Sequence, residues 1–172
     1  MPTSASENKL KAKEWIDKLD ISTVLDIGVG EGTYSNLLRK ENQTWIGIEA
    51  YYPYVAQYNL GEKYDEVIVG DARYINYEKL GIFDIITCGD MLEHLKREEA
   101  EELIQTLVER CTNLLICFPI LHLEQHDDNN PFEEHKDHWS KNDMQDLLDS
   151  QELKYKSVSG DILAYFLIKG KV

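Results

Sequence analysis

The chain has 172 residues, of which 42% are hydrophobic and 29% are charged. This composition predicts one compact domain with its own core and excludes a disordered or low-complexity chain. Acidic residues number 32 against 18 lysines and arginines, which gives a formal net charge of -14. Because proteins that grip a phosphate backbone use clustered lysine and arginine, tight unaided binding to DNA or RNA is disfavoured.

The sequence shows no apolar stretch of the roughly 20 residues that a membrane helix needs. Residues 1–8 are polar and lack the charged start and apolar run of a signal peptide. We therefore expect a cytoplasmic protein without a membrane anchor, with a flexible N-terminus at 1–8 and one folded domain at 9–172. The cysteines form no CxxC pair and lie in or beside apolar runs, which predicts buried free thiols at Cys88, Cys111 and Cys117.

Apolar spacing alternates between helical and strand-like periods along almost the whole chain. In chain order, it predicts a helix over 9–19, a strand over 23–27, a helix over 33–40, a strand over 44–48, a helix over 51–59, and strands over 66–69 and 82–88. It then predicts a helix over 97–110, a strand over 113–118, an aperiodic loop over 119–138, a helix from its cap at Ser140 through Asp149, and strands over 153–159 and 162–169.

This alternation predicts a single-domain α/β fold, doubly wound, with a mostly parallel sheet covered by helices on both faces. Gly160 and Asp161 separate the last two strands and are typical of a tight hairpin turn. The last strand is therefore expected to run antiparallel to its neighbour.

A glycine-rich turn follows the first predicted strand, in the sequence VLDIGVGEG over residues 24–32. Gly28, Gly30 and Gly32 stand at alternate positions before the next helix. Glycine permits positive φ and lets the backbone approach a ligand closely, and the start of a helix offers unpaired N–H groups. In an open α/β sheet the ligand crevice lies beyond the carboxyl ends of the strands, so this turn predicts a ligand site.

Acidic residues stand at the ends of the following strands. Glu49 ends the second strand, 21 residues after Gly28, where a carboxylate can accept both hydroxyls of an adenosine ribose. The third strand ends in the step from Gly70 to Ala72, which can place Asp71 near an adenine amino group. A Gly89-Asp90 step follows the fourth strand.

These segments resemble, in order, the motifs of class I S-adenosylmethionine (SAM)-dependent methyltransferases, over nearly the whole of 23–169. The resemblance implies a seven-stranded Rossmann-like sheet of order 3-2-1-4-5-7-6 with an antiparallel seventh strand. It also implies a donor site in which the glycine turn holds the methionine portion, Asp26 faces its amino group, the end of the second strand holds the ribose, the end of the third borders the adenine, and the end of the fourth closes the pocket. The residues so implied are Asp26, Gly28, Val29, Gly30, Gly32, Glu49, Ala50, Asp71, Ala72, Cys88 and Gly89.

A nicotinamide-dinucleotide site is the rival interpretation of the glycine turn. That fold wants a glycine at the sixth position of the turn, where this chain has Thr33. It also leaves Asp26, Asp71 and the terminal hairpin unexplained. A glycine turn without any ligand would leave Glu49 and Asp71 at two strand ends by coincidence.

The acceptor side of the site is expected among the five histidines, which follow the fourth and fifth strands and therefore meet at one edge of the sheet: His94, His122, His126, His135 and His138. On a helical turn Asp90, Glu93 and His94 would share one face. This pattern resembles the metal sites of ubiquinone-pathway O-methyltransferases and small-RNA 2′-O-methyltransferases. The resemblance implies a site for Mg²⁺, Mn²⁺ or Zn²⁺ with Asp90, Glu93, His94 and His135 as ligands.

Two plainer interpretations of this segment stay open. A Glu-His-Leu step after the fourth strand is widespread in methyltransferases that bind no metal. The loop is also simply acidic and solvated, with a single lysine, Lys136, against Glu124, Asp127, Asp128, Glu133, Glu134 and Asp137.

The expected reaction is an in-line displacement at the sulfonium methyl group, in which the protein aligns nucleophile, methyl carbon and sulfur. A base near neutral pKa can take the acceptor's proton, and the candidates are His94, then His135, with Asp90 as orienter or alternative base. The catalytic signature of amino-methylating DNA enzymes is missing after the fourth strand, which favours transfer to oxygen or nitrogen of a small molecule or a protein. A non-catalytic SAM-binding subunit is the alternative, and the oligomeric state stays open.

Overall fold

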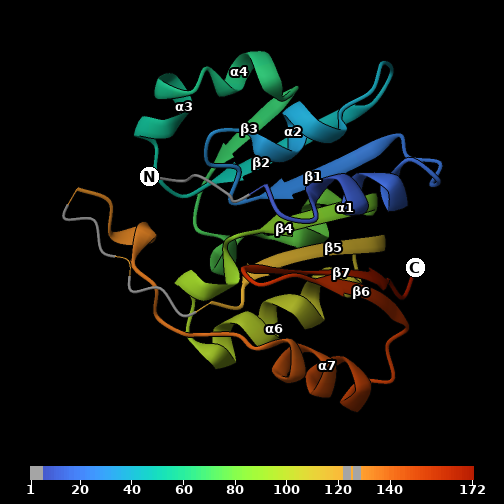
Figure 1. The fold of residues 1–172 in the computed structure, drawn as a ribbon. Helices are drawn as coiled ribbons and strands as arrows, with labels where there is room; N and C mark the ends of the chain where they lie inside the picture. Colours follow the sequence, from blue (N-terminus) through green and yellow to red (C-terminus); the bar gives the residue numbers. More distant parts are fainter. Residues whose placement is uncertain (1–5, 122–124, 126–128) are drawn as a thin grey trace.

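The computed structural model describes residues 6–121, 125 and 129–172, and seven strands form its central sheet (Figure 1). The strand order is β3-β2-β1-β4-β5-β7-β6, as the family resemblance implies. The strands are β1 (Thr23–Ile27), β2 (Thr44–Glu49), β3 (Glu66–Val69), β4 (Phe83–Gly89), β5 (Cys111–Pro119), β6 (Tyr155–Ser159) and β7 (Leu163–Lys169). β1 to β5 pair in parallel, and β7 pairs antiparallel with both β5 and β6. The predicted fold class is therefore confirmed.

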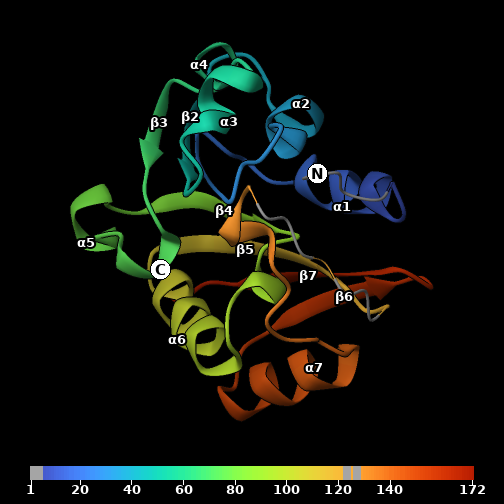
Figure 2. The same ribbon diagram turned by 90° about the vertical axis from the view of Figure 1, so that its left-hand side faces the viewer.

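Helices cover both faces of the sheet (Figures 1 and 2). They are α1 (Lys9–Ile16), α2 (Thr33–Leu38), α3 (Pro53–Gln57), α4 (Leu60–Lys63), α5 (Tyr77–Leu80), α6 (Arg97–Val108) and α7 (Lys141–Ser150). α1, α2 and α4 contribute to the core on one face, and α5, α6 and α7 to the core on the other. Because the central strands β4, β5 and β7 lie between these layers, their side chains are buried on both faces, as their continuous apolar runs predict.

The helix predicted over 51–59 is shorter in the structure, where it is α3, and the unpredicted helix α4 follows it. Asn59 adopts φ 51° between α3 and α4, in the left-handed region that interrupts a helix. α5 and the three 3-10 turns, η1 (Ala72–Tyr74), η2 (Leu92–His94) and η3 (Pro131–Glu133), were not predicted. Elements of three or four residues are too short to show a period.

Part of the N-terminal segment 1–8, which we expect to be flexible, contacts the rest of the fold. Residues 1–5 lie outside the described part, but the Glu7 carboxylate accepts the backbone N–H groups of Asp161, Ile162 and Leu163 at 2.9, 2.9 and 2.7 Å. These bonds join the N-terminal segment to the turn between β6 and β7. Within the described ranges, the helices are all too short or too polar to cross a bilayer.

Candidate functional site

A cavity of about 230 Å³ opens where the carboxyl ends of the parallel strands meet. Its walls come from the glycine turn after β1, the ends of β2, β3 and β4, the hairpin before β7, and the segment between β5 and α7. Parallel strands bring residues distant in sequence to one edge of a sheet, which is where ligands of open α/β sheets bind. The cavity therefore lies where the sequence predicts the ligand site.

The glycine turn lies against Met91 and the second strand. Gly28 has φ 70°, and a Cβ atom there would come within 2.8 Å of the Met91 side chain. The N–H groups of Gly28 and Val29 both donate to the carbonyl of Ile48, at 2.9 and 3.2 Å. A side chain at position 28 would thus be strained and would crowd the cavity wall.

Glu49 is 5% exposed and stands at the end of β2. One oxygen of its carboxylate accepts the N–H of Gly30 at 3.0 Å, and the other accepts that of Tyr51 at 2.8 Å. Burial raises the pKa of this carboxyl group, and these backbone bonds oppose the rise. The two bonds hold the carboxylate beside the glycine turn.

Asp71 lines the same cavity as Glu49. It caps η1 by accepting the N–H of Arg73 at 3.0 Å, and it pairs with the Arg73 guanidinium. The hydrogen bonds from the Arg73 side chain lower the pKa of the Asp71 carboxyl group. Glu49 and Asp71, two of the three acidic residues that the sequence assigns to the donor, thus share one cavity.

Asp26 lies beneath the glycine turn and does not line the cavity. It is 1% exposed, and its carboxylate accepts the hydroxyls of Tyr64 at 2.5 Å and Thr87 at 2.6 Å. Burial raises the pKa of this carboxyl group to about 6. That Asp26 faces the methionine amino group, directly or through water, stays a prediction. Of the other residues expected at the donor site, Gly32 and Cys88 also do not line the cavity. Those that do are Gly28, Val29, Gly30, Glu49, Ala50, Asp71, Ala72 and Gly89.

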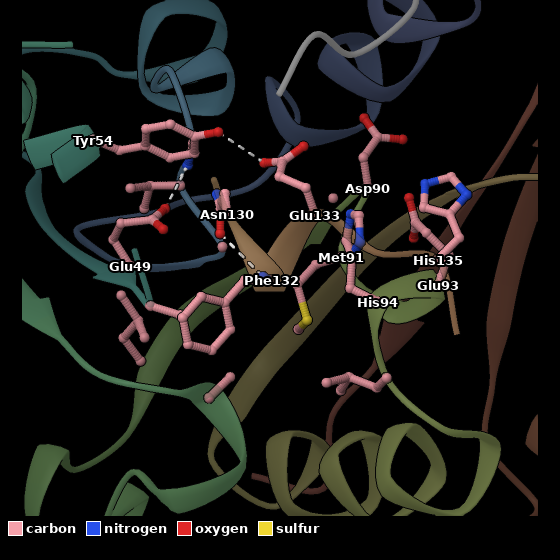
Figure 3. A pocket seen from close by; sticks show the side chains of 18 of the residues that line it. Glu49, Tyr54, Asp90, Met91, Glu93, His94, Asn130, Phe132, Glu133 and His135 are labelled. Carbon is pink, nitrogen blue, oxygen red and sulfur yellow. Dashed lines mark hydrogen bonds between the residues drawn. The ribbon is translucent and has the colours of Figure 1, made fainter. Parts of the chain in front are cut away.

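Three predicted metal ligands lie together on the side of the cavity away from Glu49 (Figure 3). Each of Glu93, His94 and His135 offers a ligand atom, and these atoms lie within 4.8 Å of one another. Glu93 is 3% exposed, and its Oε2 atom has no hydrogen-bond partner. The rings of the two histidines meet edge to face, with centroids 4.9 Å apart.

The environment of this cluster disfavours charge. Burial raises the pKa of Glu93 well above its usual range and lowers the pKa of His94 to about 4. The His94 Nδ1 atom lies 3.2 Å from the carbonyl of Glu134. A buried carboxyl group beside two imidazoles can bind a cation or take part in proton transfer.

Asp90 does not belong to the group of three clustered ligand atoms. It adopts φ 50°, and its N–H donates to the carbonyl of Cys117 at 2.9 Å. Because this left-handed residue precedes η2, the helical face expected for Asp90, Glu93 and His94 does not form. Asp90 still lines the cavity. His138 does not line it, and its backbone carbonyl accepts a hydrogen bond from Arg97. His122, His126, Glu124, Asp127 and Asp128 fall outside the described residues.

Residues 129–137, part of the loop predicted over 119–138, contribute to the wall of the cavity. We call residues 129–137 the strap. Asn130, Phe132 and Glu133 of the strap line the cavity, as does Tyr54 of α3 (Figure 3). The N–H groups of Lys136 and Asp137 donate to the carbonyl of Glu93 at 2.8 and 3.2 Å, which joins the strap to η2. Its lack of period hid these contacts, although Asn130 before Pro131 is a recognisable turn signal.

Comparisons with known proteins agree with this arrangement. Residues 24–113 match a family described as "Methyltransferase domain". A search among curated proteins finds no match. Since the match spans more than half of the chain, the chain belongs to the methyltransferase-domain family, in the class I Rossmann-like, SAM-dependent group.

Solved structures with the same fold are distant in sequence. The small RNA methyltransferase HEN1 is 16% identical with a TM-score of 0.75, and the match covers 100% of this chain and 27% of that one. The N-terminal domain of EvdMO1, crystallised in the presence of SAH and D-fucose, is 14% identical with a TM-score of 0.69 over 98% of this chain and 84% of that one. Magnesium protoporphyrin IX methyltransferase from Synechocystis PCC 6803, with bound SAM, is 15% identical with a TM-score of 0.69 over 96% and 79%. At such identities the likeness concerns the fold.

Proposed function

We propose that this methyltransferase transfers the methyl group of SAM to an oxygen or nitrogen atom of a small molecule or a protein. The donor assignment rests on one observation: Glu49, Asp71 and residues 28–30 all line the same cavity. Glu49 would accept the ribose hydroxyls, Asp71 and Ala72 would border the adenine, and the glycine turn would hold the methionine portion. Asp26 would face the methionine amino group through water, since its carboxylate is bonded to Tyr64 and Thr87.

The acceptor would enter on the side of Glu93, His94 and His135. His94 and His135 are the candidate bases. The low pKa of His94 keeps its imidazole neutral at neutral pH and makes it a weaker base than an ordinary histidine. Asp90 would orient the acceptor or serve as an alternative base. The hairpin residues Ile162 and Leu163 would enclose the acceptor, because they line the same cavity.

The same cluster fits a divalent metal. One carboxylate and two imidazoles form a mixed oxygen and nitrogen donor set that suits Mg²⁺, Mn²⁺ or Zn²⁺. The Glu93 Oε2 atom, which has no hydrogen-bond partner, offers a coordination position, and Asp90 is the nearby candidate for a fourth ligand. A bound metal would polarise an acceptor hydroxyl and lower its pKa.

The proposed class of methyl acceptor is inferred from the net charge of the protein. With a net charge of -14 the protein repels polyanions, and a neutral or cationic acceptor fits better. This charge also agrees with a soluble cytoplasmic protein, the location that we propose.

Thermal unfolding with SAM and with its demethylated product S-adenosylhomocysteine tests the donor site. Ligand at a hundredfold over its dissociation constant adds about 2.7 kcal/mol, which should raise the melting temperature by roughly 5–10 °C for a domain of this size. Glu49→Ala should remove most of this shift. Glu41→Ala, at an exposed position before β2, is the matched control. No shift in the unmodified protein would refute the donor site.

Transfer of a labelled methyl group to small-molecule, protein and RNA fractions tests the acceptor class. Labelling confined to RNA would contradict the proposal, and donor binding without labelling of any fraction would favour a non-catalytic SAM-binding subunit. Titration with Mn²⁺, followed by electron paramagnetic resonance, tests the metal. Glu93→Gln should weaken Mn²⁺ binding at least tenfold, and absence of binding in the unmodified protein would remove the metal from the proposal.

A further inference from the structure

The guanidinium group of Arg73 bridges two carboxylates at the edge of the donor cavity. Its Nε and Nη2 atoms donate to Asp71 at 3.0 and 2.5 Å, and its Nη1 atom donates to Glu99 at 2.7 Å. Arg73 and Asp71 both line the cavity, and Glu99 belongs to α6. The planar fork of arginine suits such two-sided binding, because its donors have a fixed geometry.

Backbone bonds fix both ends of this bridge. The Asp71 carboxylate accepts the N–H of Arg73 at 3.0 Å at the start of η1. The Glu99 carboxylate accepts the N–H of Lys96 at 3.0 Å at the start of α6. The three side chains are 18% to 30% exposed, so solvent screens the bridge less than it would screen an ion pair on the open surface. Neither carboxylate can turn without losing a bond to the backbone.

The bridge determines which hydrogen bonds the Asp71 side chain can form. Hydrogen bonds from Arg73 lower the pKa of Asp71 and raise that of Arg73, so both groups stay charged near neutral pH. An ionised carboxylate only accepts hydrogen bonds. A ligand group that meets it must therefore carry an N–H or O–H, and a carbonyl oxygen in the same place would be repelled.

We propose that Arg73 is a positioning residue that holds Asp71 in one orientation as a hydrogen-bond acceptor, so that the cavity selects a 6-aminopurine over a 6-oxopurine. The proposal rests on the donor site proposed above, with the adenine beside Asp71. Arg73 would act through Asp71 and need not touch the ligand. Because Glu99 holds the other side of the guanidinium, the start of α6 also supports this selection.

Calorimetric titration with S-adenosylhomocysteine and with S-inosylhomocysteine, which carries a 6-oxo group, tests the proposal. The unmodified protein should prefer the adenosyl ligand by about tenfold to a hundredfold, the usual range for a hydrogen bond to a charged group. Arg73→Gln should bring this preference to within about threefold, mainly by weakening the adenosyl ligand, and Glu99→Gln should reduce it less. Arg110→Gln is the matched control, because Arg110 pairs with the exposed Glu78 away from the cavity.

Asp71→Asn separates this proposal from the donor site itself. The asparagine amide can donate to a 6-oxo group, so the preference should fall to near unity or reverse. If Asp71→Asn removes the preference but Arg73→Gln keeps it, or weakens both ligands equally, the role of Arg73 is refuted and the donor site stands. If the unmodified protein binds neither ligand, the proposed donor site fails instead. Unfolding of each variant without ligand verifies that it folds.

Discussion

The hydroxyl of Tyr54 donates a hydrogen bond to the Glu133 carboxylate at 3.1 Å, across 79 positions of sequence. Tyr54 belongs to α3, which follows the strand that ends in Glu49, and Glu133 belongs to the strap. Gln125 holds the other carboxylate oxygen at 2.9 Å. Figure 3 shows the strap residues Asn130 and Phe132 between Glu49 and Met91. The bond therefore closes the strap over the side of the cavity that we assign to the donor.

Tyr54→Phe should loosen this closure without removing the aromatic ring from the core. We expect S-adenosylhomocysteine to dissociate about three to ten times faster, since one hydrogen bond to a charged group is lost. Stopped-flow displacement measures this rate. Tyr52→Phe removes a hydroxyl from a largely exposed neighbour and should leave the rate unchanged. Equal rates for Tyr54→Phe and the unmodified protein would show that the bond does not hold the ligand in.

Gly89 ends β4 under the ring of Tyr34, and a Cβ atom there would overlap that ring. Tyr34 is 5% exposed and packed in the core, so its ring cannot move aside freely. Gly89→Ala should lower the free energy of unfolding by about 1–3 kcal/mol, as measured by urea denaturation. Gly61→Ala is the control, because a Cβ atom in α4 would meet nothing within 4 Å. A Gly89→Ala protein as stable as the Gly61→Ala protein would contradict this account.

The buried Asp26 makes stability depend on pH between about 4 and 6. Its pKa is raised from 3.8 to about 6 in the folded protein, so the folded state binds the proton more tightly than the unfolded state. The free energy of unfolding should therefore fall as pH rises through this window, by roughly 3 kcal/mol for this group alone. Above pH 6 Asp26 is ionised in the folded protein, and its buried charge lowers the free energy of unfolding by this full amount.

Asp26→Asn should remove this contribution, and urea denaturation at pH 5 and pH 7.5 measures it. The stability difference between the two pH values should shrink in the variant. Asp65→Asn is the control, because the N–H of Trp45 chiefly lowers the pKa of Asp65. That variant should lose stability at both pH values and keep the difference. An unchanged difference in Asp26→Asn would mean that Asp26 does not titrate in this range.

The sequence predicted those features of the fold and of the site that depend on the residue type at one position or on the spacing of its neighbours. The glycines at 28–32, Glu49 at the end of β2 and the apolar run of β5 each follow from local spacing, and the family resemblance supplied the order of the strands. The break between α3 and α4 depends on the single left-handed residue Asn59, which helical spacing does not register.

Local sequence patterns could not predict contacts between residues that are distant in the chain. The bond between Tyr54 and Glu133 joins two segments that only the folded sheet brings together. The Asp26 carboxylate accepts a hydrogen bond from Tyr64, which lies 38 positions away, and no local pattern predicts this contact. The group of Glu93, His94 and His135 was predicted because its pattern resembles a known motif, whereas the left-handed backbone at Asp90 has no signature in the sequence.

Glu7 holds the turn between β6 and β7, whose residues Ile162 and Leu163 line the cavity. Three backbone N–H groups donate to its carboxylate and lower its pKa from 4.5. The protection of these three amides from hydrogen exchange should thus be present above pH 4.5 and be lost as pH falls through the folded-state pKa of Glu7. Glu7→Ala should speed amide hydrogen exchange at 161–163 about tenfold or more, with a smaller effect for Glu7→Gln, whose neutral amide oxygen still accepts. Glu14→Ala, an exposed change in α1, should leave this exchange unchanged, and equal exchange in Glu7→Ala would show that the turn holds its shape without Glu7.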